Sequence, residues 1–299
     1  MVKIVGVDRE RCIKCEKCVE VCIVLLFSIE RNEETKEKSI IFSDSLKRCF
    51  RCGHCIAICP TEAISYEDAD DPYNFEEASN PEKILSFDDL MKLVRSRRSI
   101  RKYEDKPVPR EKIDSILDVM RYAPSASNRQ GSKYIVITDL NKIRELSKKV
   151  ANMIAKTKKY FKLRYLVIPF TKGVIRKRLL NPKTKKSMMM FLEETAKGRD
   201  LIFFHAPCVI ILYAPKYSQM TGPDAGIAIT HGMFAAQALG LGTCWIGFAQ
   251  EYLWRSKKTR KKLGIPKWCN VYGVMIVGYP TLKFKRAPPR RQLKVQWLE

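Results

Sequence analysis

Apolar segments long enough to cross a membrane are absent from this sequence. The longest purely apolar run, Val21 to Phe27, is far shorter than the roughly 18 residues that a spanning helix needs. The first residues, Met1–Glu10, bring charge before any long apolar stretch and contain no small-residue cleavage site, which argues against secretion. We therefore expect a cytoplasmic protein.

The dinucleotide-binding fingerprint G-x-G-x-x-G is also absent, so the sequence offers no sign of a Rossmann-type site. Composition argues against disorder, collagen and a coiled-coil rod, because 45% of the residues are hydrophobic and 29% are charged, close to globular averages. A length of 299 residues predicts about two globular domains at roughly 150 residues each.

Acidic residues are scarce in one stretch and abundant in another. The chain as a whole carries 56 Lys and Arg against 32 Asp and Glu, a net charge of +24. Residues 1–80 contain 11 basic and 16 acidic residues, whereas residues 141–190 contain 16 basic residues and the single acid Glu145, a net charge of +15. The basic excess is therefore concentrated, which indicates a local role rather than a general surface property.

Cysteine is concentrated at the start of the chain, where eight of the 11 cysteines precede residue 60. Two runs repeat the spacing C-x2-C-x2-C-x3-C, and they consist of Cys12, Cys15, Cys18 and Cys22, then Cys49, Cys52, Cys55 and Cys59. In a chain without a secretion signal, such density indicates a metal site rather than a disulfide framework.

This spacing is typical of proteins with two 4Fe–4S clusters, in which the fourth cysteine of each run ligates the other cluster. The predicted ligand sets are Cys12, Cys15, Cys18 and Cys59 for one cluster, and Cys49, Cys52, Cys55 and Cys22 for the second. The alternative is a pair of zinc knuckles, which is disfavoured because zinc sites usually use two separated pairs of ligands.

Residues 1–66 resemble the two-cluster bacterial ferredoxin domain, and the eight cysteines carry that resemblance. Residues 67–86 are acidic, are interrupted by Pro72 and Pro81, and show no apolar period, so they are expected to form a linker. The larger domain is then expected over residues 87–299.

Apolar periodicity predicts several elements in the larger domain. Helices are expected from the capping residue Ser86 to about residue 96, over 110–121 and over 224–239. Strands are expected over 134–137, 208–213 and 271–277. Cys208, Cys244 and Cys269 are interpreted as packing residues.

Three segments of this domain have the chemistry of an anion or cofactor site. Arg97–Arg101 offers three guanidinium groups and a hydroxyl, which suit an anionic ligand, although a solvated face is the alternative. Pro124–Gly131 is a polar loop of small residues that a flat ring could approach, or an ordinary turn. Gly240–Gly247 contains glycines that allow backbone N–H groups to face a ligand.

Taken in this order, and followed by Gly278-Tyr279-Pro280 and Pro289-Arg290, these segments resemble the FMN-dependent nitroreductase family. The resemblance implies an α+β fold for this domain, a homodimer and FMN bound at the subunit interface. Together with the first domain, the chain is similar to nitroreductases fused to a ferredoxin domain.

The resemblance also implies the roles of individual residues. Arg97, Arg98 and Ser99, joined by Arg290, would meet the FMN phosphate and ribityl chain, and Arg101 would approach the N1/O2 edge of the flavin. Ser125, Ser127 and Asn128 would line the ring in a loop that also brings Pro124, Ala126 and Gln130 to the site, while backbone groups of Trp245, Ile246 and Gly247 would reach its N5/O4 side. No residue stands out as a general acid, so the catalytic residues are not assigned.

The leading hypothesis is an FMN-dependent oxidoreductase in which two 4Fe–4S clusters pass single electrons to FMN. The flavin would then deliver a hydride from N5 to a small organic acceptor, such as a nitro compound or an activated alkene. The alternatives are a flavin-dependent dehalogenase, a flavin-modifying enzyme, and a non-catalytic electron-transfer or redox-sensing module.

The basic segment 141–190 is interpreted as an insertion that forms a lid over the flavin. It would contact solvent, an acidic ferredoxin or other low-potential electron donor, an anionic or lipophilic substrate, or a membrane surface. Nucleic acid is disfavoured as a partner because the sequence contains no recognisable binding module.

Overall fold

The computed structural model describes residues 2–156, 163, 166 and 168–299. These residues group into two compact units. The first unit comprises Met1–Ser86 together with Ser125–Gln130, and the second comprises Phe87–Pro124 and Gly131–Glu299. The sequence predicted domains over residues 1–66 and 87–299 with a linker between them, and it gave no sign that Ser125–Gln130 would group with the first unit.

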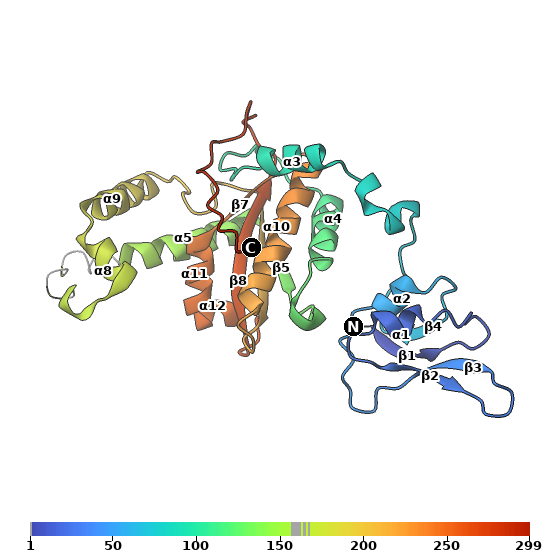
Figure 1. Cartoon of the computed structure of the whole chain (residues 1–299). Helices are drawn as coiled ribbons and strands as arrows, with labels where there is room; N and C mark the ends of the chain where they lie inside the picture. Colours follow the sequence, from blue (N-terminus) through green and yellow to red (C-terminus); the bar gives the residue numbers. More distant parts are fainter. Residues whose placement is uncertain (1, 157–162, 164–165, 167) are drawn as a thin grey trace. The chain divides into compact units, whose positions relative to one another are not determined.

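The first unit consists of two short antiparallel sheets and two short helices (Figure 1). Its elements in chain order are β1 (Lys3–Val7), α1 (Lys17–Val21), β2 (Phe27–Arg31), β3 (Lys38–Phe42), α2 (His54–Ile58) and β4 (Ile64–Glu67). Strand β1 pairs with β4, and β2 pairs with β3. A small apolar core that includes Leu26, Phe27 and Ile40 also contains the cysteines Cys18 and Cys55. The cysteine loops are therefore part of the core of this unit.

The predicted linker is not without structure. It contains two short 3-10 turns, Glu76–Ser79 and Pro81–Lys83. No side chain from Glu67 to Lys83 belongs to the apolar cluster of the first unit. Proline at the first position of the second turn fits, because proline supplies the required φ and needs no backbone partner there.

A four-stranded antiparallel sheet forms the centre of the second unit, with strand order β5-β6-β8-β7. The strands are β5 (Lys133–Ile137), β6 (Cys208–Pro215), β7 (Gly242–Trp245) and β8 (Cys269–Gly278). Helices α4 (Arg110–Arg121) and α10 (Thr221–Ala238) pack on one face, and α5 (Leu140–Lys156) and α11 (Gly247–Arg255) pack on the other (Figure 1).

The alternating side chains of β6 explain these three layers. Cys208, Ile210 and Leu212 belong to the core shared with α4 and α10, whereas Val209 and Ile211 belong to the core shared with α5 and α11. Successive residues of a strand point to opposite faces, so a strand that is apolar at every position requires cover on both faces. The predicted helix over 110–121 and the predicted strands are confirmed, and all three packing cysteines are buried.

Within the described residues, the remaining α-helices are α3 (Phe87–Ser96), α8 (Gly173–Leu180), α9 (Pro182–Ala196) and α12 (Lys257–Lys262). Of the predicted insertion 141–190, residues 157–162, 164, 165 and 167 lie outside the described residues. Among the helices that the structure describes, none is both long enough and apolar enough to span a membrane.

Candidate functional site

Two cavities in the first unit are lined by cysteines. Cys12, Cys15, Cys18 and Cys59 line one small cavity. Cys22, Cys49, Cys52 and Cys55 line the other. Among the described residues, no group of three or more His, Cys, Asp or Glu side chains is arranged to hold a single metal ion. The cysteines that line each cavity are the same groups of four that the spacing predicts.

The two cysteine loops share an unusual backbone conformation. Residues two and four positions after the first cysteine of each run, Lys14 and Glu16, then Arg51 and Gly53, all have φ between 55° and 75°. This left-handed conformation costs a residue other than glycine about 1 to 2 kcal/mol. Alternating left-handed residues form concave groups of backbone N–H donors that bind anions, iron–sulfur clusters included. The repeated conformation fits a pair of thiolate-bound clusters.

Backbone donors reach the sulfur of each fourth cysteine. The N–H of Ala63 donates to Cys59 Sγ at 3.2 Å, and the N–H of Leu26 donates to Cys22 Sγ at 3.4 Å. Hydrogen bonds to cluster sulfurs are among the factors that set cluster reduction potentials. The fourth cysteines of the two runs thus accept the same kind of backbone hydrogen bond, in each case from the residue four positions later.

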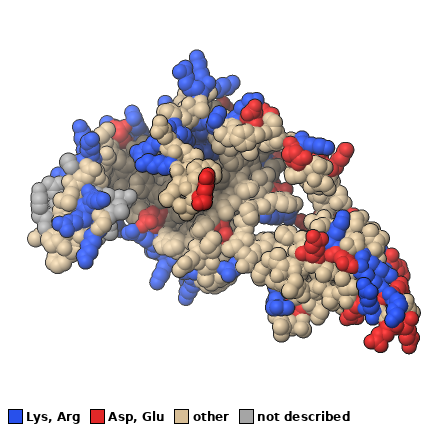
Figure 2. Space-filling model, viewed as in Figure 1, with Lys and Arg blue, Asp and Glu red and all other residues tan. Residues whose placement is uncertain are grey.

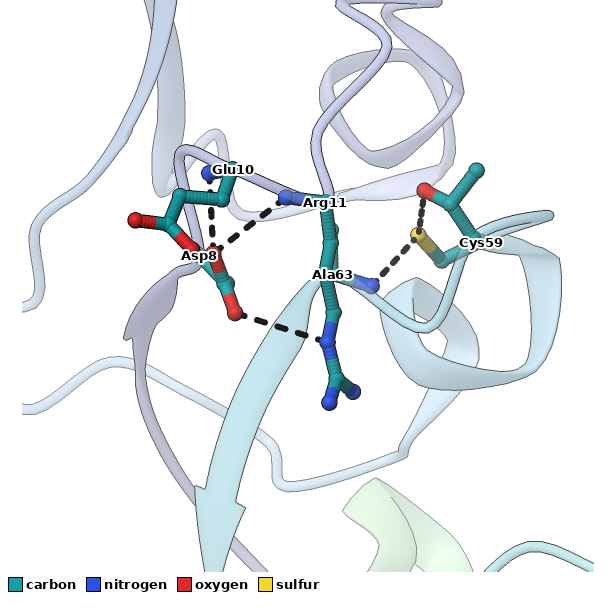
Figure 3. Close-up of polar contacts among 6 residues, drawn as sticks. Asp8, Glu10, Arg11, Cys59 and Ala63 are labelled. Atoms are coloured by element: carbon teal, nitrogen blue, oxygen red, sulfur yellow. Dashed lines mark hydrogen bonds and ion pairs between the residues drawn. The ribbon is translucent and has the colours of Figure 1, made fainter.

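Asp8 connects the first cysteine run to the segment after Cys59. Figure 3 shows its contacts with Glu10 and Arg11. Its carboxylate accepts hydrogen bonds from the N–H groups of Glu10 and Arg11 at 2.9 and 3.3 Å, which orders the turn that enters Cys12. Its own N–H donates to the Ala63 carbonyl at 2.7 Å. These bonds bring Cys12 and Cys59 to one cavity although they are far apart in the sequence.

Asp44 orders the turn before the second run in a similar way, although it lies five residues before Cys49 and Asp8 lies four before Cys12. Its carboxylate accepts from the N–H groups of Arg48 at 2.6 Å and Cys49 at 3.2 Å. The neighbouring Ser43 N–H donates to the Leu26 carbonyl at 2.9 Å, which joins this turn to the segment after Cys22. The sequence alone did not point to Asp8 or Asp44, because only the fold shows which backbone N–H groups their carboxylates accept from.

Burial raises the pKa of the Cys55 thiol to about 12, and it also raises the pKa values of Cys18 and Cys49. Iron binds the thiolate form of cysteine. A cluster in either cavity would therefore supply the positive charge that stabilises these buried sulfurs as anions.

The predicted arginine segment of the second unit is held against the edge strand β7. Ser99 forms a parallel bridge with Thr243, and the Ile100 N–H donates to the Thr243 carbonyl at 2.9 Å. Further along, Tyr103 bridges Pro280, and the Glu104 N–H donates to the Tyr279 carbonyl at 2.9 Å. Three of the sequence segments that suggested a flavin site, around residues 97–103, 242–247 and 278–280, are thereby adjacent.

Two glycines permit this close approach. A Cβ at Gly242 would lie 2.5 Å from Ile100 Cγ1, and a Cβ at Gly278 would lie 2.7 Å from Tyr103 Cδ1. Both distances are far below van der Waals contact, so each glycine leaves room for the arginine segment. The glycines of Gly240–Gly247 were expected to admit a ligand, but at Gly242 the space is filled by Ile100.

Arg98 is fixed by main-chain acceptors. Its guanidinium donates to the carbonyls of Arg95 at 2.6 Å, Arg97 at 2.5 Å and Arg286 at 2.7 Å, and it lies 5.7 Å from the centre of the Phe284 ring. Arg98 therefore ties the segment to the chain near the C-terminus. Arg101 is exposed, and its guanidinium carbon lies 5.9 Å from the centre of the Phe204 ring.

The other predicted cofactor residues are distributed as follows. Trp245 ends β7 and donates from Nε1 to Gln250 Oε1 at 2.7 Å, Ile246 is buried, and Gly247 begins α11.

The predicted polar loop is divided between the two units. Pro124 belongs to the second unit, whereas the first unit includes Ser125, Ala126, Ser127, Asn128 and Gln130. Asn128 Nδ2 donates to the Arg51 carbonyl at 2.7 Å. Arg290 is exposed. The structure thus gathers the arginine and glycine segments, and the role of each residue toward FMN stays a prediction.

The two cysteine-lined cavities of the first unit are typical of an iron–sulfur redox protein. The second unit is an α+β domain with an arginine segment at the edge of its sheet. A sequence profile of the 4Fe-4S dicluster domain matches residues 11–69, and the profile of the nitroreductase family matches residues 94–279, more than half of the chain. The chain belongs to the nitroreductase family and is an oxidoreductase of that family with an N-terminal 4Fe–4S dicluster domain. The zinc-knuckle alternative is thereby set aside.

Individual relatives are distant. A protein of Archaeoglobus fulgidus provisionally named NADH dehydrogenase/NAD(P)H nitroreductase is 28% identical over 199 residues, which cover 65% of this chain and 87% of the relative. The FMN reductase (NAD(P)H) of Bacillus subtilis is 24% identical over 202 residues, 68% of this chain and 70% of the relative. A Desulfitobacterium hafniense nitroreductase crystallised with FMN shares the fold at a TM-score of 0.53 and 20% identity, covering 70% of this chain and 97% of that one.

Single cysteine substitutions test the predicted ligand sets. We expect Cys59→Ala to remove the cluster held by the first run and Cys22→Ala to remove the cluster held by the second, because each residue lines the cavity of the opposite run. Iron content and EPR of the anaerobically reconstituted chain would show which cluster is lost. Cys208→Ala is the control, since Cys208 is buried in β6, and it should keep both clusters. Loss of the cluster of the same run would contradict the assignment.

The close approach at Gly242 generates a second prediction. Gly242→Ala should displace Ile100 and the arginine segment, lowering the free energy of unfolding by about 1 to 3 kcal/mol and reducing the amount of flavin that copurifies. Gly6→Ala is the control, because no heavy atom lies within 4 Å of a Cβ at that position in β1 of the first unit. Denaturant unfolding and flavin absorbance would compare the two variants. Equal stability and flavin content in both would show that the contact is unimportant.

Proposed function

We propose that this chain is an FMN-dependent oxidoreductase that receives single electrons through two 4Fe–4S clusters and reduces a small organic acceptor. When bound, the clusters would supply one-electron transfer and FMN would supply hydride transfer. The observation that carries the proposal is the arginine segment fastened to β7 in a chain that also surrounds two cavities with eight cysteines.

The donor groups on the arginine segment suit the phosphate of FMN. Arg97 and Arg98 are partly buried and Ser99 is exposed, so guanidinium and hydroxyl donors lie on consecutive residues. Planar guanidinium groups match phosphate oxygens in geometry and charge. The segment is held by main-chain bonds to β7, which leaves the Arg97 and Ser99 side chains to contact the phosphate, and Arg290 is proposed to join them.

Arg101 is proposed to approach the N1/O2 edge of the flavin. A reduced flavin carries negative charge at that edge, and a nearby cation stabilises it. Tyr103 stabilises the backbone beside this position, because its hydroxyl donates to the Ile100 carbonyl at 2.7 Å. The polar loop Ser125–Gln130 is proposed to line the ring, together with the backbone of Trp245, Ile246 and Gly247.

A homodimer is part of the proposal, as the family resemblance implies. Helix α10 supports it, because this 18-residue helix contains no Lys or Arg and exposes Ile227. A helix that is apolar around much of its circumference favours burial on more than one side. The proposed partners also include a small-molecule substrate and an electron donor, which is either NAD(P)H or a low-potential protein carrier.

Turnover with a panel of acceptors tests the proposed reaction. The anaerobic full-length chain is supplied either with a reduced low-potential carrier or with NAD(P)H, and products from nitroaromatic, activated-alkene and haloaromatic compounds are identified. Reduction of a nitro group or alkene supports the proposal. Halide release would favour a dehalogenase instead, and no turnover with any compound would favour an electron-transfer module.

Arg101→Ala should lower the flavin reduction potential and slow flavin reduction by on the order of tenfold, equivalent to about 1.4 kcal/mol, with little loss of bound FMN. The physical reason is the missing cation beside the reduced ring. Lys102→Ala removes an equally exposed neighbouring cation and serves as the control. Potentiometric titration checks the result, and equal potentials in the Arg101→Ala variant and the original chain would refute the assigned role.

A further inference from the structure

The stretch between Glu145 and Glu193 contains no acidic residue. It carries 14 basic residues, of which 11 are lysines. A chain with 32 acidic residues elsewhere would be expected to interleave some of them here if the stretch were an ordinary solvated surface. The complete absence of acids therefore indicates a surface that meets negative charge.

Helices α8 and α9 pack against each other and display part of this charge (Figures 1 and 2). Six cations on and beside these helices are exposed, and we call them the α8–α9 cations: Lys172, Arg176, Lys177, Lys183, Lys185 and Lys186. No carboxylate of a described residue lies within ion-pair distance of any of them. Their charge is therefore not neutralised within the described part of the chain.

Large apolar side chains are exposed among these cations. Phe170 is 89% exposed, and Leu180 and Met190 are each 55% exposed. Phe170 immediately precedes α8, Leu180 ends that helix, and Met190 lies on α9. Helices α8 and α9 and the residues beside them thus carry both exposed cations and exposed apolar groups that water solvates poorly.

This combination distinguishes between the classes of anionic partner. Nucleic acid would use the cations but leave the aliphatic side chains in water. Protein interfaces are depleted in lysine and enriched in arginine, tyrosine and tryptophan, whereas this stretch has 11 lysines and only 3 arginines. Membrane-surface segments are rich in lysine and arginine and insert phenylalanine or leucine at the level of the lipid headgroups.

We propose that the α8–α9 cations, together with Phe170, Leu180 and Met190, bind the surface of an anionic phospholipid bilayer. The lysines attract the acidic headgroups from a distance of about one Debye length, roughly 8 to 10 Å at ordinary salt. The apolar side chains then enter the boundary between headgroups and acyl chains. The proposal is independent of the reaction that the chain catalyses.

Sedimentation with vesicles tests the proposal on the full-length chain. The vesicles contain phosphatidylcholine alone or phosphatidylcholine with one quarter phosphatidylserine, at two salt concentrations. We expect binding only to the vesicles with phosphatidylserine, and weaker binding at higher salt. Because each lysine near an anionic surface contributes roughly fivefold, the triple variant Lys183→Gln/Lys185→Gln/Lys186→Gln should bind on the order of a hundredfold more weakly.

Two further variants separate this surface from general charge and from misfolding. The control Lys257→Gln/Lys258→Gln/Lys261→Gln removes the same charge from exposed positions of α12 and should bind as the original chain does. Phe170→Ser keeps every charge and should weaken binding about tenfold through the lost apolar side chain. Equal losses in the two triple variants, or equal binding to both vesicle types, would overturn the proposal. Poly-glutamate and RNA are tested in parallel as other anionic partners, and binding to either of them but to no vesicle would also overturn it.

Discussion

Main-chain hydrogen bonds between segments far apart in the sequence position both the cysteine runs and the arginine segment. The Asp8 N–H to Ala63 carbonyl bond brings Cys12 and Cys59 together, and the Ile100 N–H to Thr243 carbonyl bond holds the arginine segment on β7. Because these bonds join backbone groups, the cysteines, Arg97 and Arg101 are left for ligands. Arg98 is the exception, since its guanidinium donates to the carbonyls of Arg95, Arg97 and Arg286.

The two units offer their ligands different chemical groups. The first surrounds its cavities with cysteine sulfurs, which are soft ligands, and its left-handed residues Lys14, Glu16 and Arg51 are conformationally strained. The second presents hard cationic donors at a sheet edge, where Gly242 and Gly278 allow the backbone segments to approach closely. Thiolates suit iron and guanidinium groups suit phosphate, so the division matches a chain that holds two kinds of redox cofactor.

Features that depend on local pattern could be predicted from the sequence. The helix over residues 110–121 and the buried strand that begins at Cys208 follow from apolar periodicity, and both are present. The cysteine spacing predicted two groups of four, and two cavities are lined by those groups. In contrast, the contact of Gly242 with Ile100, the similar roles of Asp8 and Asp44, and the bond from Asn128 to Arg51 all join distant segments. Such contacts have no local signal, because the fold alone brings their partners together.

The most direct test of the account is an anaerobic stepwise reduction of the isolated full-length chain, with iron, sulfide and flavin quantified on the same sample. Visible absorbance and EPR would follow the clusters and the flavin separately. The account predicts about eight irons and one FMN per chain, with the flavin reduced by way of the clusters. Iron without flavin, or clusters whose reduction never reaches the flavin, would contradict it.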